Sequence, residues 1–157
     1  MSVSALRERT VASTSAEATR RLARRLAAVA RAGDLVCLVG ELGAGKTQFA
    51  KGFAAGLGVR GTVSSPSFIL IAEHSGRLPL FHLDLYRLAG ASDAIASGLL
   101  DERQAGGVTL IEWAERLGPV LPAGRLDVVI EGSGDEARTI RLRTDDPGYA
   151  RYLEVAG

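Results

Sequence analysis

The sequence predicts an α/β fold in which helices pack on a mixed central sheet, and three observations support this class. The run Leu35–Val39 is entirely apolar, which is typical of a strand covered on both faces. Helical patterns at residues 15–31 and 46–57 stand on either side of it, so helix and strand alternate at the front of the chain. Behind them come paired strand patterns joined by short turns. Parallel and antiparallel neighbours are therefore expected within one sheet.

Length and charge place the chain in a broad class. Its 157 residues match one domain, residues 1–157, with a core of its own. Nineteen basic and 18 acidic residues leave a net charge of +1, too small for long-range attraction to DNA or RNA. The apolar runs are strand-sized and the first residues do not resemble a signal peptide, so we expect a cytoplasmic protein without a membrane segment. The single cysteine, Cys37, is expected to be a small buried apolar residue.

The first helix is expected to begin with a capping box made by Thr14 and Glu17. Leu22, Leu26 and Val29 then recur at helical spacing, and most of the arginines fall on the other faces. At this net charge the arginine-rich side is interpreted as a solvated surface rather than an RNA-binding one.

Apolar runs separated by short polar turns make up the rest of the chain. Five further strands are expected from them, at residues 67–73, 78–85, Val108–Glu112, Leu126–Glu131 and 137–142. The first two and the last two are close enough in sequence to form hairpins. A weak helical pattern covers 91–100, and a short helix is expected from Tyr149 onward.

The turn between the apolar strand and the second helix fits the rule G-x-x-x-x-G-K-[ST], in the context that this rule requires. Its glycines allow successive N–H groups to turn inward, and the helix N-terminus adds partial positive charge, so the loop predicts a phosphate site and a P-loop NTPase-like fold. Lys46 is expected to reach the outer phosphates, and Thr47 to offer its hydroxyl to Mg²⁺. The expected cofactor-binding residues are Glu41, Leu42, Gly43, Ala44, Gly45, Lys46, Thr47 and Gln48.

Residue usage supports the phosphate loop and favours ATP over GTP as the nucleotide. Of the 19 basic residues only Lys46 and Lys51 are lysines, and a lysine stands at the phosphate position, where a slim point charge suits better than a forked guanidinium. The sequence contains no asparagine and therefore no N-K-x-D segment of the kind that reads guanine. Thr14, Ser15 and Thr19 are candidates for contacts with the base.

Two acidic residues stand where predicted strands end. Asp84 and Glu112 are expected near the loop because ligands of open α/β sheets gather at the carboxyl ends of strands. Each carboxylate can hold Mg²⁺, directly or through water, or orient the attacking water, and the sequence does not separate these roles. The expected catalytic residues are Lys46, Asp84 and Glu112.

Three nearby residues have more than one interpretation. His82 shares the face of Asp84 and either forms a hydrogen bond near the site or is a packed core residue, and the second interpretation is favoured. Trp113, the only tryptophan, is either a core anchor or a ring that lines the site. Arg87 either neutralises phosphoryl charge or is solvated.

Three further segments carry a resemblance to a known family. They are Ser64-Ser65-Pro66-Ser67-Phe68, His82-Leu83-Asp84-Leu85-Tyr86-Arg87-Leu88 and Ile111-Glu112-Trp113. Together with the phosphate loop, they resemble the bacterial TsaE (YjeE) family, the small P-loop ATPases needed to make threonylcarbamoyladenosine in tRNA. The resemblance covers about residues 14–143, and the second and third segments are far more specific than the loop.

The resemblance implies an ATPase that binds TsaD and TsaB partners and keeps threonylcarbamoyl transfer turning over, with tRNA as the indirect substrate. Slow hydrolysis by the chain alone is expected because the sequence shows no obvious arginine finger beyond Arg87. By the same resemblance, Thr47 and Glu112 match metal-binding positions, Asp84 matches the acid that faces the phosphates, and residues 64–67 match a mobile switch loop. The sequence departs from the family at Gln48, where a second hydroxyl residue is usual, and this longer amide cannot approach the inner phosphate in the same way. Serines also replace the usual threonines at positions 64 and 67.

Two other functions compete with this one. A small-molecule kinase fits the chain size. Such enzymes commonly carry an arginine-rich lid over the phosphates, but residues 89–107 contain a single arginine, Arg103. An adaptor that binds ATP without hydrolysing it is the second alternative, and it is opposed by the intact set of loop and carboxylate residues.

Overall fold

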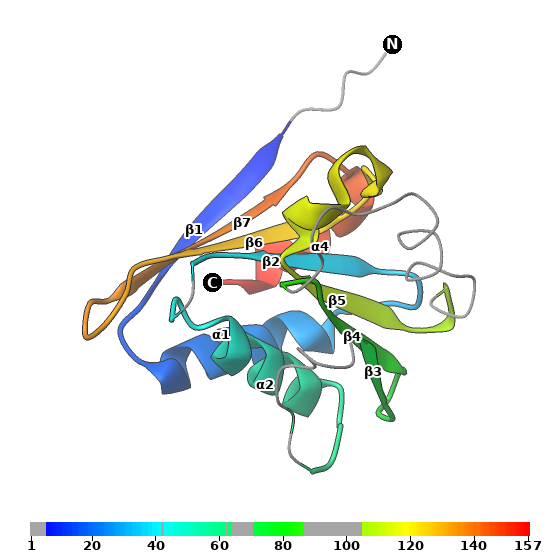
Figure 1. Cartoon of the computed structure of the whole chain (residues 1–157), viewed down its shortest axis with the longest axis horizontal. Coiled ribbons are helices and arrows are strands. Elements are labelled where there is room, and N and C mark those ends of the chain that lie inside the picture. The colour runs from blue at the N-terminus through cyan, green and yellow to red at the C-terminus, as the bar shows by residue number, and fades with distance from the viewer. Residues whose placement is uncertain (1–5, 42, 62, 64–70, 87–104) are drawn as a thin grey trace.

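The computed structural model describes residues 6–41, 43–61, 63, 71–86 and 105–157. Within these ranges the strands form one mixed sheet in the order β1-β7-β6-β2-β5-β4-β3 (Figure 1). They are β1 (Arg7–Ser13), β2 (Leu35–Val39), β3 (Ile71–His74), β4 (Leu80–Asp84), β5 (Val108–Glu112), β6 (Leu126–Glu131) and β7 (Arg138–Thr144). The helices are α1 (Ala16–Ala28), α2 (Lys46–Gly56) and α4 (Ala150–Val155), with the 3-10 helices η2 (Ala114–Val120) and η3 (Pro147–Tyr149).

The centre of the sheet is parallel and its flanks are antiparallel. β2 pairs in parallel with β5 and β6, and β4 pairs in parallel with β5. β7 lies antiparallel between β1 and β6, and β3 lies antiparallel to β4. The expected mixed sheet and both hairpins are therefore confirmed. The parallel strands bring their carboxyl ends, at Val39, Asp84 and Glu112, to one edge of the sheet.

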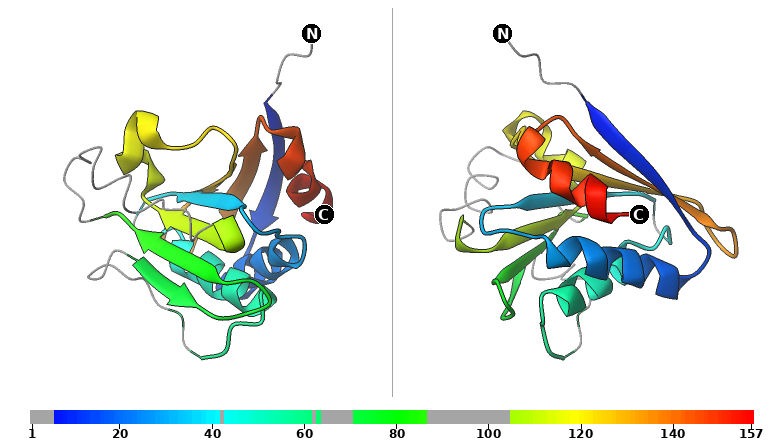
Figure 2. Two further views of the ribbon diagram at one scale, coloured as in Figure 1. Left: turned by 90° about the vertical axis from the view of Figure 1, so that its right-hand side faces the viewer. Right: turned by 180° about the vertical axis from the view of Figure 1, so that it is seen from behind.

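The two faces of the sheet have different covers. α1 and α2 lie side by side on one face (Figures 1 and 2), where they share a core with alternate residues of the central strands. α4 joins this core through the buried Tyr152. On the other face η2 contributes Leu117 to a smaller cluster that contains Cys37 and Ile111. The carboxyl edge of the sheet therefore lies between two well-packed layers.

The first helix begins one residue later than expected. Ser15, not Thr14, is its N-cap, and the Ser15 hydroxyl accepts a hydrogen bond of 3.0 Å from the amide of Ala18. The predicted capping box at Thr14 and Glu17 is therefore wrong. The reason is that Ser15 already has extended backbone angles, φ −158° and ψ 162°, which direct its side chain at the first turn. Glu17 instead forms an exposed ion pair with Arg21.

The two helices approach closely because small residues line their contact. A Cβ atom on Gly52 would lie 2.3 Å from the carbonyl oxygen of Arg20, and one on Gly56 would lie 2.7 Å from that of Arg24. Any larger residue at these two positions would push α1 away from α2. This contact fixes the position of α2, whose first residue is Lys46.

Most predicted elements match the structure within one to three residues, and three elements, β1, η2 and η3, were not predicted. β2, β5 and β6 have the expected bounds, α2 ends at Gly56, and α4 forms in the expected tail. The edge strand β1 was not predicted, because residues of the run Arg7–Ser13 alternate only weakly between apolar and polar. η2 was not predicted either. The expected strand residues 67–70 and the weak helix at 91–100 lie outside the described residues.

Cys37 has no exposed surface, as expected of a residue in the middle of β2. Burial raises the pKa of its thiol to about 12. None of the helices in the described part of the chain has the length and apolar character needed to cross a bilayer.

Candidate functional site

The phosphate loop connects β2 to α2 at the carboxyl edge of the sheet (Figure 1). Gly43 and Gly45 have positive φ angles of 83° and 113°, a region that glycine enters without steric cost. Gly45 is the N-cap of α2, and no side chain in the described part of the protein caps this helix end. The first amides of α2 therefore face the loop as hydrogen-bond donors for an anion.

Lys46 begins α2 and crosses the loop. Its Nζ donates a hydrogen bond of 2.6 Å to the carbonyl oxygen of Gly40 and lies 3.7 Å from the ring centroid of Trp113. Only 6% of the residue is exposed. Burial lowers the pKa of Lys46, while the nearby carboxylates of Glu112, Glu115 and Asp84 act in the opposite direction. A positive charge is thus held between the loop and a group of acidic side chains.

Asp84 and Glu112 lie next to each other, as their places at strand ends predicted. The two residues are direct partners in the parallel pairing of β4 and β5, and each is 3% exposed. Glu112 is also paired with Leu38 of β2, just before the loop. One oxygen of Asp84 accepts a 2.9 Å hydrogen bond from the amide of Tyr86, so this carboxylate also caps the turn after its strand.

His82 contacts the site, so both interpretations of this residue apply. Its Nε2 lies 2.7 Å from Oε2 of Glu112, and the histidine has no exposed surface. An ionised carboxylate can only accept hydrogen bonds, so Nε2 is the donor when Glu112 is ionised. Nδ1 has no partner among the described residues. His82 is a packed core residue as expected, and it also fixes one oxygen of Glu112.

Trp113 fits both of its alternative interpretations. Its ring packs against the cluster around Cys37 and also lies under the ammonium group of Lys46. Tyr86 packs beside it, with ring centroids 5.1 Å apart. Trp113 has a positive φ of 62°, which is strained for a residue with a large side chain. The tryptophan therefore closes one side of the phosphate loop.

The structure places the remaining loop residues as follows. Glu41 follows β2 and accepts a backbone hydrogen bond from Ala44, while Thr47 lies in the first turn of α2 beside Lys46. Gln48 accepts a 2.5 Å hydrogen bond from Arg20 of α1 through Oε1. The amide that replaces the usual hydroxyl thus ties α2 to α1. Leu42, the segment 64–67 and Arg87 lie outside the described residues.

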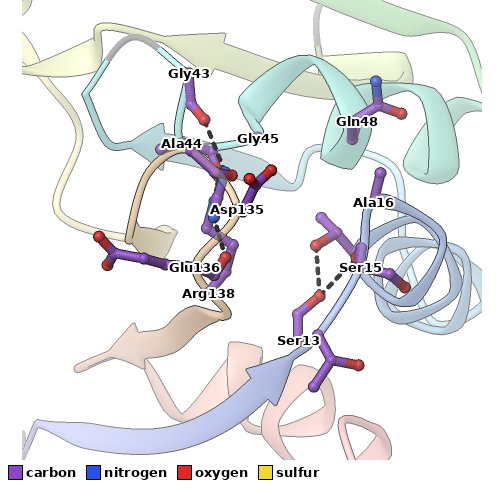
Figure 3. A pocket seen from close by; sticks show the side chains of 13 residues that line it. Ser13, Ser15, Ala16, Gly43, Ala44, Gly45, Gln48, Asp135, Glu136 and Arg138 are labelled. Atoms are coloured by element: carbon purple, nitrogen blue, oxygen red, sulfur yellow. Dashed lines mark hydrogen bonds between the residues drawn. The ribbon is translucent and has the colours of Figure 1, made fainter.

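A cavity of about 340 Å³ opens beside the loop (Figure 3). Three segments line it: the entry to α1, the loop with the start of α2, and the turn between β6 and β7. Its residues are Ser13, Thr14, Ser15, Ala16, Thr19, Gly43, Ala44, Gly45, Gln48, Gly134, Asp135, Glu136 and Arg138. The three expected base-contact candidates are among them. The β6–β7 turn was not predicted as part of the site, because no local motif marks it as a ligand-binding segment.

The donor set suits a hard cation that shares its ligands with a nucleotide. Glu112, Asp84 and Thr47 offer oxygen atoms, which Mg²⁺ prefers. Among the described residues, no three His, Cys, Asp or Glu side chains form a cluster that could hold a metal ion alone. The residues therefore fit Mg²⁺ whose remaining ligands are phosphate and water.

Comparison with known proteins places the chain in a family. The family model "Threonylcarbamoyl adenosine biosynthesis protein TsaE" matches residues 13–140. The TsaE protein of Bacillus subtilis is 46% identical over 140 residues, which cover 88% of this chain and 87% of the relative. The TsaE protein of Streptomyces coelicolor is 44% identical over 126 residues, covering 78% of this chain and 85% of the relative.

A solved structure agrees with these relatives. The crystal structure of Bacillus subtilis YdiB superimposes with a TM-score of 0.79 at 36% sequence identity, and the match covers 97% of this chain and 95% of that one. The fold and the resemblance seen in the sequence are therefore both confirmed. The chain belongs to the TsaE family of tRNA threonylcarbamoyladenosine biosynthesis proteins.

Proposed function

We propose that this chain binds Mg-ATP at its phosphate loop and hydrolyses it, as the ATPase subunit of the threonylcarbamoyladenosine machinery. One observation carries the proposal: the buried ammonium group of Lys46 lies at the phosphate loop, in the field of the adjacent carboxylates Asp84 and Glu112. This combination supplies the cation, the anion nest and the acidic groups that phosphoryl transfer requires.

Lys46 provides the charge that binds and polarises the phosphates. Its Nζ donates to the carbonyl of Gly40, a neutral acceptor inside the loop. A phosphate oxygen is a stronger acceptor because it is charged, so it replaces Gly40 as the partner of Nζ. The Trp113 ring keeps water from one side of the ammonium group, which strengthens its interaction with the developing negative charge.

The carboxylates and Thr47 bind the metal ion and orient the attacking water in this proposal. Mg²⁺ bound by Thr47 and Glu112 would neutralise charge on the outer phosphates. His82 holds Oε2 of Glu112, which leaves Oε1 for the metal or its water shell. Asp84 is the neighbouring acid, and it orients water at the same edge of the sheet.

The cavity beside the loop suits the nucleoside. Its volume of about 340 Å³ lies within the range of roughly 300–1,000 Å³ that small-molecule sites occupy. It adjoins Gly43, Ala44 and Gly45, so a nucleotide whose phosphates enter the loop can place its base there. Asp135 and Glu136 on the rim can accept hydrogen bonds from the amino group of adenine.

Family membership supports TsaD- and TsaB-like partners, with tRNA as the substrate of the complex and the transfer chemistry carried out by the TsaD-like subunit. The near-zero net charge agrees with binding to proteins rather than direct binding to nucleic acid. Hydrolysis by the chain alone is slow in this scheme, and the partners accelerate it.

Phosphate release from ATP, measured with and without TsaD and TsaB, tests the proposal. We expect phosphate release to rise with the partners. It should fall at least a hundredfold in Lys46→Ala, Asp84→Ala and Glu112→Ala, because the loss of one transition-state contact commonly lowers kcat by about 10²–10³-fold. Lys51→Ala is the matched control, because this second lysine of α2 is exposed.

Two other results of this assay would favour the alternative functions. ATP binding without hydrolysis, even with the partners, would favour the adaptor function. Phosphate transfer to a metabolite would favour the kinase. GTP, whose base also has donors for the acidic rim, is included to decide the nucleotide.

A further inference from the structure

Arg138 connects the phosphate loop to a distant part of the chain. It is the first residue of β7, and its side chain reaches back along the cavity to the loop (Figure 3). On the loop, Nε donates 2.9 Å to the carbonyl oxygen of Ala44, and Nη2 donates 3.2 Å to that of Gly43. On the β6–β7 turn, Nη2 donates 3.0 Å to the carbonyl oxygen of Gly134, and Nη1 donates to that of Glu136.

These bonds fix the orientation of loop peptides. A trans peptide points its C=O and its N–H in opposite directions, so holding the carbonyl of Ala44 on the outside directs the amide of Gly45 to the other side. The loop needs such support because Gly43 and Gly45, both with positive φ, are the residues with the greatest backbone freedom. Arg138 therefore favours the loop conformation whose amides face the phosphates.

The same bonds argue against a direct catalytic role for Arg138. A guanidinium has five N–H donors, and the hydrogen bonds to Ala44, Gly43, Gly134 and Glu136 use four of them. An arginine that stabilises a transferring phosphoryl group needs its fork of N–H donors for the phosphate oxygens. Here the donors go to backbone carbonyls.

The turn is shaped around this side chain. Gly132 has a positive φ of 120°, and a Cβ atom there would lie 3.0 Å from Cδ of Arg138 and 2.8 Å from the carbonyl oxygen of Ala137. Only glycine leaves room for the arginine to fold back toward the loop. The contact is thus supported from the turn as well as from the loop.

We propose that Arg138 is a positioning residue for phosphate binding, which fastens the phosphate loop to the β6–β7 turn so that the two form one preorganised wall of the nucleotide site. This inference rests on the proposed binding of nucleotide at the loop. Arg138 acts through the loop backbone, so its loss weakens the binding of ADP and ATP and leaves the hydrolytic groups in place.

The binding test compares Arg138→Ala and Arg138→Lys with the wild type, using calorimetric titration of Mg-ADP. Arg138→Ala is expected to weaken ADP binding about tenfold, which corresponds to about 1.4 kcal/mol. Arg138→Lys is expected to fall between the two, since an ammonium group replaces only part of the fork. Arg143→Ala is the matched control: Arg143 lies on the same strand and pairs with Glu8, away from the loop.

Two further readouts separate positioning from general stability. In hydrogen exchange without nucleotide, the amides of residues 43–47 in Arg138→Ala should exchange faster while those of the β5 core do not. In steady-state hydrolysis, KM for ATP should rise with little change in kcat, whereas Lys46→Ala lowers kcat. If Arg138→Ala does not fold, Arg138→Lys carries both readouts.

Wild-type ADP affinity in Arg138→Ala, or exchange at residues 43–47 equal to that of the wild type, would overturn the inference. So would a loss of affinity matched by Arg143→Ala. Absence of ADP binding by the wild-type chain would contradict the proposed function instead, and the exchange measurement would still decide whether Arg138 holds the loop.

Discussion

Nε2 of His82 lies 2.7 Å from Oε2 of Glu112, and both side chains are buried at the carboxyl edge of the sheet. The two residues come from neighbouring strands, β4 and β5, and are separated by 30 positions in the sequence. The bond commits one oxygen of the proposed metal ligand to the protein, so Glu112 presents its other oxygen in a fixed direction.

We expect His82→Leu to raise the Mg²⁺ concentration needed for half-maximal ATP binding by about tenfold, because loss of a partner behind a metal ligand commonly costs 10–100-fold in metal affinity. His82→Gln, which retains a donor, should lose less. Binding is followed by calorimetry across a Mg²⁺ series. Lys51→Ala is the control, since Lys51 is exposed on α2. An unchanged Mg²⁺ requirement in His82→Leu would show that the bond serves only the fold.

Cys37 predicts how stability changes at alkaline pH. Burial raises the pKa of its thiol from 9.0 to about 12, so the folded protein keeps a proton that the unfolded chain releases above pH 9. This contribution to stability is complete below pH 9 and is lost as the pH rises from 9 toward 12, at about 1.4 kcal/mol per pH unit.

Urea unfolding at pH 8, 9 and 10 measures this loss. The free energy of unfolding should fall more steeply above pH 9 in the wild type than in Cys37→Ala, which has no thiol to ionise. Parallel pH profiles for the two proteins would contradict the prediction. Reaction of the thiol with an aromatic disulfide reagent should also require unfolding, because Cys37 has no exposed surface.

The local parts of the site are readable in the sequence. The apolar strand β2, the glycine-rich turn and Lys46 are contiguous, so periodicity and one motif predict them together. Asp84 and Glu112 are expected at the carboxyl edge of the sheet because both end apolar strands, and both lie there in the structure.

The contacts between distant segments are not readable in this way. The bond of His82 to Glu112 depends on which strands are neighbours and in which register. Arg138 stands 94 residues from Ala44, and nothing in its own surroundings in the sequence points to the loop. β1 is an edge strand with charged residues at its start, and such strands lack the apolar alternation by which others are recognised.

Trp113 predicts an optical signal for nucleotide binding. It is the only tryptophan, and the ammonium group of Lys46 lies 3.7 Å from its ring centroid. Lys46 changes partner when a phosphate replaces Gly40, so the charge next to the ring moves and the emission of Trp113 should change on addition of Mg-ADP. Lys51→Ala should give the wild-type signal. Calorimetric binding of ADP without any change in emission would mean that Lys46 keeps its present contacts.

Gln48 offers a test of the departure from the family pattern. Its Oε1 accepts a 2.5 Å hydrogen bond from Arg20, which links α2 to α1. Gln48→Thr removes this link and restores the hydroxyl that family members usually carry, so its two effects should have opposite signs. The free energy of unfolding without nucleotide should fall by roughly 0.5–1.5 kcal/mol, the usual net contribution of one hydrogen bond. ADP binding should tighten several-fold, because a hydroxyl in the first turn of α2 can reach the inner phosphate.

Arg20→Ala separates these two effects, because it breaks the same link and leaves Gln48 in place. Arg20→Ala should reproduce the loss of stability without the gain in ADP affinity. In the double variant Arg20→Ala/Gln48→Thr the two stability losses should not add, since both changes remove the same hydrogen bond. Thermal unfolding and ADP calorimetry on the four proteins measure both quantities. If Gln48→Thr binds ADP no better than Arg20→Ala does, position 48 makes no contact with the inner phosphate in this chain, and the role of Gln48 is to hold α2 against α1.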